Sequence, residues 1–573
     1  MKYLFPFFLI LVSIYVYSCA NQGTPTGGPK DTIPPSLIET NPTHKSINFK
    51  GKEFTFVFDE RVNADKIKSQ LLITPIIENK YKVKIRKNEL TLTFDDKFQD
   101  STTYTLNFSE GLTDVTEKNP TINLTFAFST GHYIDSIYVN GKITDLYTNK
   151  DQAGFLVGLY EITDSLDLLK DKPRYFAKTN KKGQFLIENI KNGFYKILCF
   201  NDENKNQILN PETEAHGFLS DSLNLLTSQD SIRIPTQVIN ASPLSQIRSK
   251  TTGRYFDIQF NKSFIEYTIT KLDSNNQLSI PPNNRVKENK ILRFYPIETY
   301  NYDSDSLGII VDAIDSVYNH SIDTSFVKFS ESTRKPDSFK AKFTPKNKTY
   351  IDPIINFEYQ FNKPIASFDK DSILIQYDSL KSQTIPDSSI IWNENKTQLK
   401  FQAIVDKQYL LTRIDTLLKI YGDTSRTDSV SKAKYKYYSQ VKTDQISIQI
   451  PEGSFISVEA DSTEGINYTY SFNTLDELGS VSGEIITNHT HFTIQLVDTK
   501  YQVIEEIKNS SIFSFPYVKP GKYTFRVLID EDQNGEWFYG NLLKDQTPEP
   551  IYFYSEIFDV RANWQLENIQ ITF

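Results

Sequence analysis

Short stretches in which apolar and polar residues alternate dominate this chain. One of the clearest runs from Phe54 to Phe58, where large apolar side chains occupy every second position. A period of two is typical of a β-strand with one buried face. The pattern returns at residues 89–94, 103–108 and 124–131, with polar turn residues between the stretches. Strands at this spacing predict an antiparallel β-sandwich.

Length and composition extend this prediction to the whole chain. The 573 residues exceed the usual size of one domain, about 100–150 residues, so we expect a string of modules. The 33 Tyr and 40 Phe suit the pleated surface of strands, and an all-β fold is predicted. The net charge of −8, without a basic stripe, argues against a nucleic-acid partner.

Residues 1–18 have the composition of a signal peptide. Lys2 precedes an apolar run from Tyr3 to Tyr17, which is too short for a comfortable membrane span. The run ends in Val-Tyr-Ser-Cys19, which resembles the lipobox of bacterial lipoproteins. In that family the cysteine becomes the mature N-terminus and carries acyl chains such as palmitate. The resemblance implies a lipid anchor at Cys19; the alternative is an ordinary secretory signal with a chance cysteine.

The segment after the cysteine predicts a tether and bears on localisation. Residues 19–32 are rich in Gly, Pro and Thr and cannot bury a core. Ala20 stands where an aspartate marks inner-membrane retention in many enterobacterial lipoproteins, so we expect the outer membrane. Acidic clusters that mark surface export in some Bacteroidota lipoproteins are also absent. The sequence leaves open whether the chain faces the periplasm or the cell surface.

The first module resembles a known family. Its segments IPPSLIETNP, FTFVFDERV, LTLTF, YTLNF and FAFSTG look like the bacterial Ig-like domain first described in S-layer proteins. Bacteroidota lipoproteins carry that domain directly after a lipobox and a similar linker. The resemblance covers residues 33–131 and implies a fold and an envelope location, not a reaction. Fainter copies predict Ig-like modules at 240–333 and 338–446, the latter interrupted at 405–440 by an insertion or a short helix.

A second repeat predicts two more modules of another type. Residues 190–206 and 518–534 align without a gap, each as strand, Gly-containing turn, strand and acidic loop. The repeat resembles the transthyretin-like sandwich of Cna-B and carboxypeptidase regulatory domains, through a "G-x-F-x-F…L-x-x-G-x-Y" pattern. We expect these modules at 134–237 and 475–573. The apolar C-terminal segment then reads as the last strand of a sandwich.

Catalytic motifs are absent from the sequence. A hydrolase needs a nucleophile, a base and an orienting group, yet the six histidines are scattered over several modules. The sequence contains no G-x-S-x-G, no H-E-x-x-H and no Gly-rich phosphate loop. We therefore predict a protein that is not an enzyme.

The best candidate ligand site is an acidic loop near the C-terminus. Asp530, Asp532, Asn534 and Glu536 place oxygen ligands at alternate positions around a glycine, as in the first half of an EF-hand-type calcium loop. The twelfth position is Asn541 instead of the bidentate glutamate of such loops. The alternative to calcium is a polar connection shaped by Asx-turns.

Three aromatic residues follow this loop directly: Trp537, Phe538 and Tyr539. They could cap the core of the last sandwich or form an exposed contact patch. An exposed patch would suit a glycan, because such platforms stack sugar rings.

These observations lead to one functional expectation and one rival. We expect an outer-membrane lipoprotein, anchored through its N-terminal lipid, that serves as a non-catalytic scaffold or partner subunit of a cell-envelope complex. The protein partners expected are those of a machine around an outer-membrane β-barrel, for assembly, secretion or gliding. The alternative is a glycan-binding or nutrient-uptake surface lipoprotein. A hydrolase with accessory modules is a third reading, for which no remaining stretch is large enough.

Overall fold

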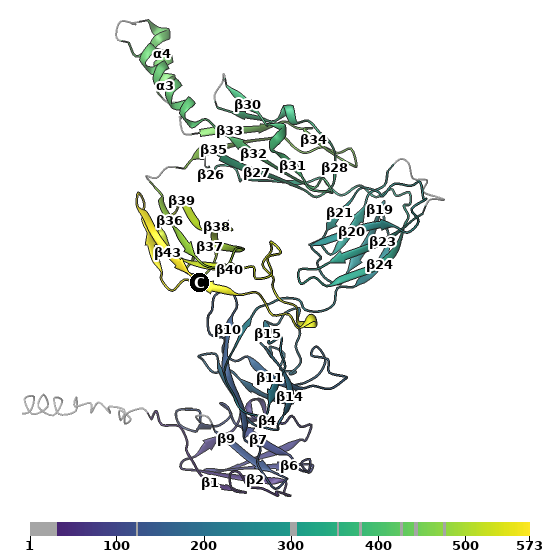
Figure 1. Cartoon of the computed structure of the whole chain (residues 1–573), viewed down its shortest axis with the longest axis vertical. Coiled ribbons are helices and arrows are strands. Elements are labelled where there is room, and N and C mark those ends of the chain that lie inside the picture. Colours follow the sequence, from purple (N-terminus) through teal and green to yellow (C-terminus); the bar gives the residue numbers. More distant parts are fainter. Residues whose placement is uncertain are drawn as a thin grey trace, which may run out of the picture. The chain divides into compact units, whose positions relative to one another are not determined.

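The computed structural model (Figure 1) describes residues 31–121, 124–297, 306–351, 354–377, 381–423, 428–439, 445–473 and 477–573. The signal peptide, Cys19 and most of the tether lie outside the described residues. Within these ranges nearly all strand pairs are antiparallel and helices are few, which confirms the all-β prediction. No helix in the described ranges is both long and apolar enough to cross a membrane.

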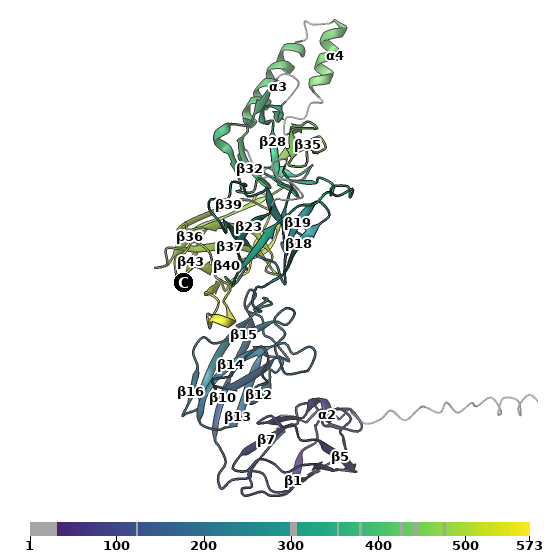
Figure 2. The ribbon, with the colours of Figure 1, turned by 90° about the vertical axis from the view of Figure 1, so that its right-hand side faces the viewer.

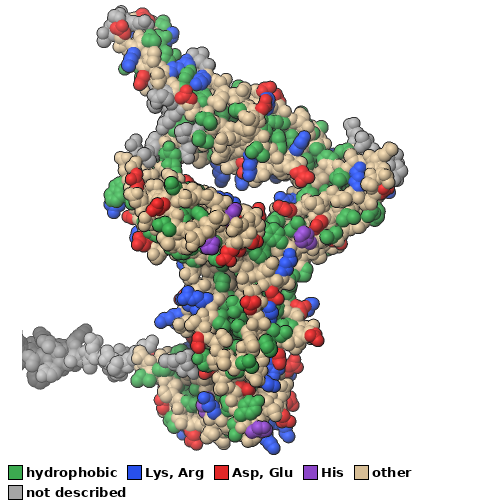
Figure 3. Space-filling model, in the orientation of Figure 1, with side chains coloured by type: hydrophobic (Ala, Val, Ile, Leu, Met, Phe, Trp, Pro, Cys, Tyr) green, Lys and Arg blue, Asp and Glu red, His purple; other side chains and the backbone are tan. Residues whose placement is uncertain are grey.

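The chain divides into two compact units, which are described separately. The first unit contains residues up to 144, 151–210 and 214–236, and the second contains 145–150, 211–213 and 237–573. The described residues form five hydrophobic cores, two in the first unit and three in the second. We number the corresponding sandwiches from first to fifth along the chain. On the face seen in Figure 3, charged side chains of both signs are interspersed.

The first sandwich pairs a four-stranded sheet, in the order β1-β2-β6-β5, with a three-stranded sheet β4-β7-β9. Its alternating strand is β2, where Phe54, Phe56 and Phe58 are all fully buried. Phe54 and Phe56 both contact Phe126 of β9 edge to face, which joins the two sheets. The elements are β1 (Leu37–Asn41), β2 (Glu53–Phe58), β3 (Val62–Asn63), α2 (Ile67–Gln70), β4 (Leu72–Thr74), β5 (Tyr81–Arg86), β6 (Glu89–Phe94), β7 (Thr103–Asn107), β8 (Thr113–Asp114) and β9 (Thr125–Ser129).

The second sandwich, also in the first unit, has a different topology. Its sheets run β13-β10-β17 and β12-β11-β14-β15, and β16 pairs with β14. The free Cys199 of β14 is fully buried in this core, as a small apolar residue would be. The strands are β10 (Ile137–Asp145), β11 (Leu156–Glu161), β12 (Tyr175–Lys178), β13 (Gln184–Ile190), β14 (Gly193–Phe200), β15 (His216–Phe218), β16 (Leu223–Leu225) and β17 (Gln229–Thr236).

The third sandwich opens the second unit and repeats the topology of the first. Its sheets run β18-β19-β22-β21 and β20-β23-β24, so each strand has a counterpart in the same position of the first sandwich. The degenerate Ig-like pattern of the sequence therefore corresponds to the same fold. The strands are β18 (Gln246–Thr252), β19 (Tyr255–Phe260), β20 (Glu266–Lys271), β21 (Asn283–Val286), β22 (Ile291–Phe294), β23 (Leu307–Ile314) and β24 (His320–Val327).

The fourth sandwich keeps this plan but extends further along the chain than the sequence suggested. Its sheets run β25-β27-β32-β31 and β26-β35-β33-β29-β30, with β28 paired to β34. The expected end at residue 446 falls inside β33, and the core continues to Phe472, because β35 supplies the last strand of the second sheet. The elements are β25 (Ala341–Thr344), β26 (Tyr350–Ile351), β27 (Ile354–Phe361), β28 (Ile365–Phe368), η1 (Lys370–Ser372), β29 (Leu374–Gln376), β30 (Ser382–Thr384), η2 (Asp387–Ser389), β31 (Ile390–Trp392), β32 (Gln398–Ile404), β33 (Gln445–Ile450), β34 (Phe455–Ser457) and β35 (Ile466–Phe472).

The interruption expected at 405–440 is a pair of helices, α3 (Lys407–Tyr421) and α4 (Ser429–Tyr438). Each helix begins after an aspartate whose side chain accepts a backbone N–H of the first turn, the usual N-cap. Figures 1 and 2 show the two helices side by side, extending from the fourth sandwich.

The fifth sandwich repeats the second. Its sheets run β39-β36-β43 and β38-β37-β40-β41, and β42 pairs with β40. The C-terminal apolar segment is the strand β43, which confirms that it belongs to a sandwich. The elements are β36 (Gly479–Ile486), β37 (Phe492–Asp498), β38 (Val503–Lys508), β39 (Ile512–Val518), β40 (Gly521–Ile529), η3 (Leu542–Lys544), β41 (Ile551–Phe553), β42 (Phe558–Val560) and β43 (Gln565–Thr572).

Candidate functional site

The candidate calcium residues lie in a long loop that joins β40 to β41, which we call the acidic loop (residues 530–550). Asp530 is buried, and its carboxylate accepts the backbone N–H groups of Asn534 at 3.2 Å and of Gly535 at 2.9 Å. Gly535 has a φ of +94°, a left-handed conformation that is costly for a residue with a side chain. The turn that the sequence indicated at this glycine is present.

A carboxylate that the sequence pattern did not reveal closes this loop. Glu549 accepts the backbone N–H groups of Glu531 at 2.7 Å, Asp532 at 3.2 Å and Phe538 at 2.8 Å. One carboxylate oxygen from each of Asp530, Asp532 and Glu549 lies within 4.8 Å of the others. Hard oxygens gathered in this way are the ligands that Ca²⁺ takes. The same hydrogen bonds already occupy the Asp530 and Glu549 carboxylates, which favours the polar connection that the sequence offered as the alternative; in a calcium site Glu549 would be a further ligand.

The second sandwich contains the same closing glutamate. Glu214, which is 2% exposed, accepts the backbone N–H groups of Glu203 at 3.2 Å and Asn210 at 2.8 Å. Glu203 and Glu531 occupy matched positions in the sequence repeat. A glutamate that holds the loop backbone is therefore part of this fold. The sequence comparison missed both glutamates because they lie beyond the aligned segment, in loops of different length.

Two of the four predicted ligands have their oxygens engaged elsewhere. The side-chain nitrogen of Asn534 donates to the Asp532 carboxylate at 2.9 Å, and its side-chain oxygen accepts the backbone N–H of Glu536 at 2.8 Å. The Glu536 carboxylate in turn accepts the hydroxyl of Tyr318, in the third sandwich, at 3.0 Å. Burial and this neighbouring carboxylate raise the pKa of Tyr318 to about 12. The structure thus brings Asp530 and Asp532 together but turns Glu536 toward the third sandwich.

The three aromatic residues contact other parts of the same chain. Trp537 lies 5.9 Å from the ring of Tyr147 and 5.3 Å from that of Tyr539, between centroids. Phe538 stacks on Tyr318 at 5.6 Å. Trp537 and Phe538 are half-buried, and Tyr539 is 43% exposed. None of the three is a member of the core of the fifth sandwich, so they do not cap that core. A contact patch that includes the exposed Tyr539 stays a prediction.

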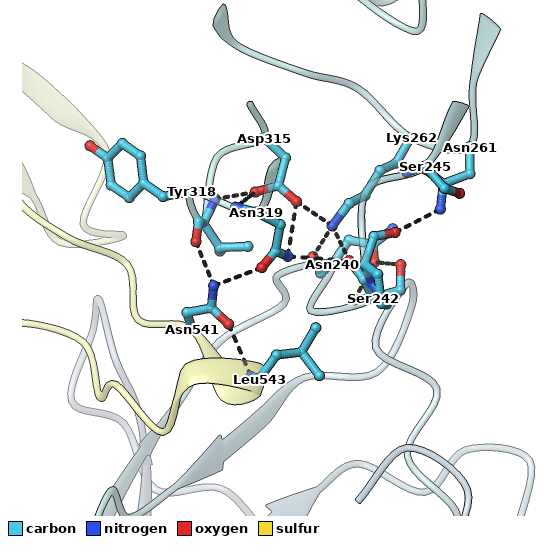
Figure 4. A network of polar contacts seen from close by, with 12 residues as sticks. Asn240, Ser242, Ser245, Asn261, Lys262, Asp315, Tyr318, Asn319, Asn541 and Leu543 are labelled. Atoms are coloured by element: carbon cyan, nitrogen blue, oxygen red, sulfur yellow. Dashed lines mark hydrogen bonds and ion pairs between the residues drawn. The ribbon is translucent and has the colours of Figure 1, made fainter. Parts of the chain in front are cut away.

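Asn541, which breaks the calcium-loop pattern, makes the central contact of this region (Figure 4). Its side-chain nitrogen donates to the carbonyl oxygen of Val317 at 2.6 Å and to the side-chain oxygen of Asn319 at 2.9 Å. Its side-chain oxygen accepts the backbone N–H of Leu543 at 2.9 Å and caps η3. Asn541 is 1% exposed, and its donors and acceptor all have partners. It therefore joins the fifth sandwich to the third.

The surface that receives Asn541 is itself held by a buried ion pair. Lys262 lies 2.6 Å from the carboxylate of Asp315, and both side chains are almost fully buried. The Lys262 ammonium also donates to the carbonyl oxygens of Asn240, at 2.9 Å, and Ser242, while Asp315 accepts the backbone and side-chain N–H groups of Asn319. Burial lowers the pKa of Lys262, and the Asp315 carboxylate opposes that shift. Figure 4 shows the Asp315 carboxylate linked both to Lys262 and to Asn319.

A further contact within the second unit involves Arg526 of β40. Its guanidinium donates to the Gln495 side-chain oxygen at 2.9 and 2.6 Å and to the carbonyl oxygen of Tyr147 at 2.8 Å. The guanidinium also lies 5.4 Å from the centre of the Tyr147 ring. Desolvation lowers the pKa of Arg526. The side chain of Gln237 donates to the carbonyl oxygen of Tyr539. The fifth sandwich therefore contacts Tyr147 and Gln237, which both belong to the second unit.

A carboxylate in the fourth sandwich forms the joint to the third. Glu459, with 3% of its side chain exposed, lies 2.7 Å from Lys363 and 3.3 Å from Arg254. It also accepts the hydroxyl of Tyr255 at 3.0 Å. Burial raises the pKa of Tyr255 to about 12. Paired in this way, the buried charges hold one arrangement of the two sandwiches, because unpaired charges there would be costly.

The family assignment covers one module. Residues 31–130 match the sequence profile of a family described as a bacterial Ig-like domain. This is the module that the sequence assigned to residues 33–131, and the likeness to that family is therefore confirmed. No curated protein matches the chain.

Several solved structures resemble this chain, with low TM-scores. The N-terminal part of the bacterial S-layer protein SbsC is 15% identical over 35% of this chain and 45% of its own length, with a TM-score of 0.14. Domains 1–6 of surface layer protein SbsC are 10% identical over 92% of this chain and 67% of theirs, with a TM-score of 0.15. The major pilin subunit BcpA of Bacillus cereus is 9% identical over 76% of this chain and 98% of its own, with a TM-score of 0.12. The chain spans less than half of the first of these structures, and scores at this level carry no functional argument.

Proposed function

We propose that this protein is an outer-membrane lipoprotein, anchored by acyl chains on Cys19, that serves as a non-catalytic scaffold or partner subunit of a cell-envelope complex. One observation carries the proposal. The acidic loop, which is the best ligand site in the sequence, engages the third sandwich through Glu536, Phe538 and Asn541. The residues that most suggested a binding site therefore act as an intramolecular joint.

Such joints suit a scaffold. Buried polar networks in which every member has a partner hold one arrangement of the parts they connect. The contact of Asn541 with the third sandwich is of this kind, and at the joint to the fourth sandwich Glu459 pairs with Lys363 and Arg254. Sandwich edges and loops away from the joints stay available for other proteins, as in strand addition. A complex around an outer-membrane β-barrel, for assembly, secretion or gliding, is the partner class that this proposal favours.

The alternative of a glycan-binding or uptake lipoprotein depends on an exposed aromatic platform. Trp537 and Phe538 are half-buried against Tyr147 and Tyr318, and Tyr539 lies at an interplanar angle of 79° to Trp537. Sugar rings stack on flat, accessible faces, so these three residues give the alternative little support.

The test is recovery of partners from the membrane. The full-length protein, tagged at its C-terminus, is extracted from its own cells in mild detergent, and co-purified proteins are quantified by mass spectrometry. We expect stoichiometric recovery of a β-barrel protein or other envelope proteins, together with incorporation of labelled palmitate into the chain.

Two controls make the result decisive. A Cys19→Ser variant separates anchoring from partner binding, because it is expected to lose the label. An unrelated lipoprotein with the same tag sets the background. Recovery of the tagged chain alone, at the background of the control, would refute the scaffold proposal; retention of the palmitate label by Cys19→Ser would refute the anchor.

A further inference from the structure

The last strand of the third sandwich lies at an open edge of its sheet (Figure 1). β24 pairs with β23 along its whole length, and in the described part of the chain no strand pairs with its other side. The equivalent edge is covered in two other sandwiches. In the first, the backbone N–H of Lys45 donates to the Ala127 carbonyl oxygen of β9 at 2.7 Å, and the N–H of Ser129 donates to the Ser46 carbonyl oxygen at 2.8 Å. In the fourth, the short strand β26 pairs with β35.

The length of one connection explains why this edge is open. The covering segments lie between the first two strands of their sandwiches, within residues 42–52 and 345–353. In the third sandwich, residues 253–254 alone separate β18 from β19. Two residues span at most about 7 Å, which is less than the roughly 10 Å between packed sheets. A side chain of β18 reaches the edge just beyond β24, where the Thr251 hydroxyl donates to the carbonyl oxygen of Lys328 at 2.7 Å.

The backbone groups on the open side belong to alternate residues of β24. The carbonyl oxygen of Gly308 in β23 accepts the backbone N–H of Leu272, which follows β20, at 2.9 Å. Gly308 lies opposite Phe326. Because bonding directions alternate along an antiparallel strand, the even-numbered residues of β24 turn their N–H and C=O groups away from β23. The open edge therefore presents the backbone of Ile322, Thr324 and Phe326.

β24 lacks the features that protect other edge strands of this chain. It contains no lysine, arginine or proline, and its pairing with β23 has no bulge. By contrast, the edge strand β5 carries Lys82 and Lys84, and the edge strand β39 contains Pro516 and a bulge. The side chains of Ile322 and Phe326 are 65% and 59% exposed. An unprotected apolar edge of this kind is a template for pairing with another chain.

We propose that β24 pairs antiparallel with β24 of a second copy of this chain, about a twofold axis that passes through Thr324. In this register Ile322 of each copy lies opposite Phe326 of the other, and the outward backbone groups of both strands meet as hydrogen-bonded pairs. Pairs of a β-branched with an aromatic residue, and of threonine with threonine, stabilise a sheet, whereas like charges directly opposite destabilise it. The carboxylate of this strand, Asp323, lies opposite Ser325. The strand is therefore complementary to itself in shape and charge.

Symmetry and size determine what kind of dimer is expected. A surface that binds itself closes at two copies, and the sheets β20-β23-β24 of both copies become one continuous sheet. One strand of each copy takes part, which is far fewer than the roughly 20–30 residues per partner of a standard interface. We therefore expect a weak, reversible dimer, with half of the chains paired at about 100 μM. This pairing goes beyond the scaffold function and needs neither Cys19 nor a membrane.

Sedimentation velocity tests the pairing on the full chain carrying Cys19→Ser, so that lipid plays no part. We expect the sedimentation coefficient to rise toward that of a dimer between about 5 and 500 μM. Thr324→Lys should stay monomeric over this range, because two ammonium groups would lie directly opposite each other. Thr324→Glu should stay monomeric for the same reason. An equimolar mixture of the two variants should pair again, since opposite charges then face each other across the axis.

Thr268→Lys is the matched control. Thr268 is exposed on β20, at the opposite edge of the same sheet, so this variant should dimerise as the parent chain does. Unchanged melting temperatures of the variants show that folding is not the cause. A monomer at every concentration, an equal loss in Thr268→Lys, or no pairing in the mixture would overturn the proposal. If the chain is monomeric, protection of residues 322–326 from hydrogen exchange by a protein recovered from the membrane would assign the edge to a segment of that protein.

Discussion

Replacing Asn541 by alanine removes the central contact between the third and fifth sandwiches while leaving both cores intact. Asn541 belongs to neither hydrophobic core. Its side chain donates to the carbonyl oxygen of Val317 and to the side-chain oxygen of Asn319, and it caps η3. The substitution should therefore open the joint and not unfold the modules.

The magnitude follows from the groups left behind. The carbonyl oxygen of Val317 and the side-chain oxygen of Asn319 lose a buried donor, at about 1–3 kcal/mol each. Loss of the cap on η3 adds about 1 kcal/mol. At the low end the joint is weakened by about 3 kcal/mol, which corresponds to roughly a hundredfold increase in its open population.

Hydrogen exchange followed by mass spectrometry measures this population. Peptides covering residues 315–320 and 538–548 are expected to exchange roughly a hundredfold faster in Asn541→Ala, since local opening sets their rate. A peptide within β37, in the core of the fifth sandwich, is expected to keep its protection. Asn534→Ala, in the exposed part of the same loop, is the matched control.

An increase of less than about threefold in the exchange rate of residues 315–320 would refute the argument. It would mean that other contacts of the acidic loop, such as Phe538 on Tyr318, hold the joint without Asn541, and that leaving buried groups unpaired costs less than assumed. Equal acceleration in Asn534→Ala would also refute the argument, because that side chain makes no contact with the third sandwich in the described structure.

Four further predictions concern stability. Gly540→Ala should lower the melting temperature clearly more than Gly535→Ala. Both glycines have positive φ, but a Cβ at Gly540 would lie 2.8 Å from Pro548, whereas a Cβ at Gly535 would have no heavy atom within 4 Å. Equal decreases would contradict this reasoning. Glu459→Gln should cost about 3–5 kcal/mol in urea unfolding, because it breaks buried ion pairs; a cost below about 1 kcal/mol would contradict it. Burial lowers the pKa of His216, so the unfolded state takes up its proton first and stability should fall as pH drops below about 6.5, a dependence that His216→Phe should reduce. Chelation of calcium should shift the melting temperature by less than about 1 °C, because backbone N–H groups already engage the carboxylates of the acidic loop; a shift of several degrees would instead support a calcium site there.

The strand pattern was readable because it is local. Phe54, Phe56 and Phe58 alternate along six residues, and alternation within one strand decides which face is buried. The repeat of residues 190–206 at 518–534 was readable for the same reason, and it corresponds to matching strands β13/β39 and β14/β40. The error at the end of the fourth sandwich arose where the helix pair separates β33 and β35 from the rest of their sheet, so that no local pattern linked them.

By itself the sequence determined the all-β class, the Ig-like character of the first module and the turn at Gly535, because each depends on residues close together in the chain. Tertiary structure alone decided what the acidic loop contacts. Glu549 closes it, Tyr318 draws Glu536 away, and Asn541 binds Asn319 across 222 positions of the chain. Spacing along a sequence sets which oxygens lie on one turn, but only packing between sandwiches determines which of them are already occupied by a partner from the same chain.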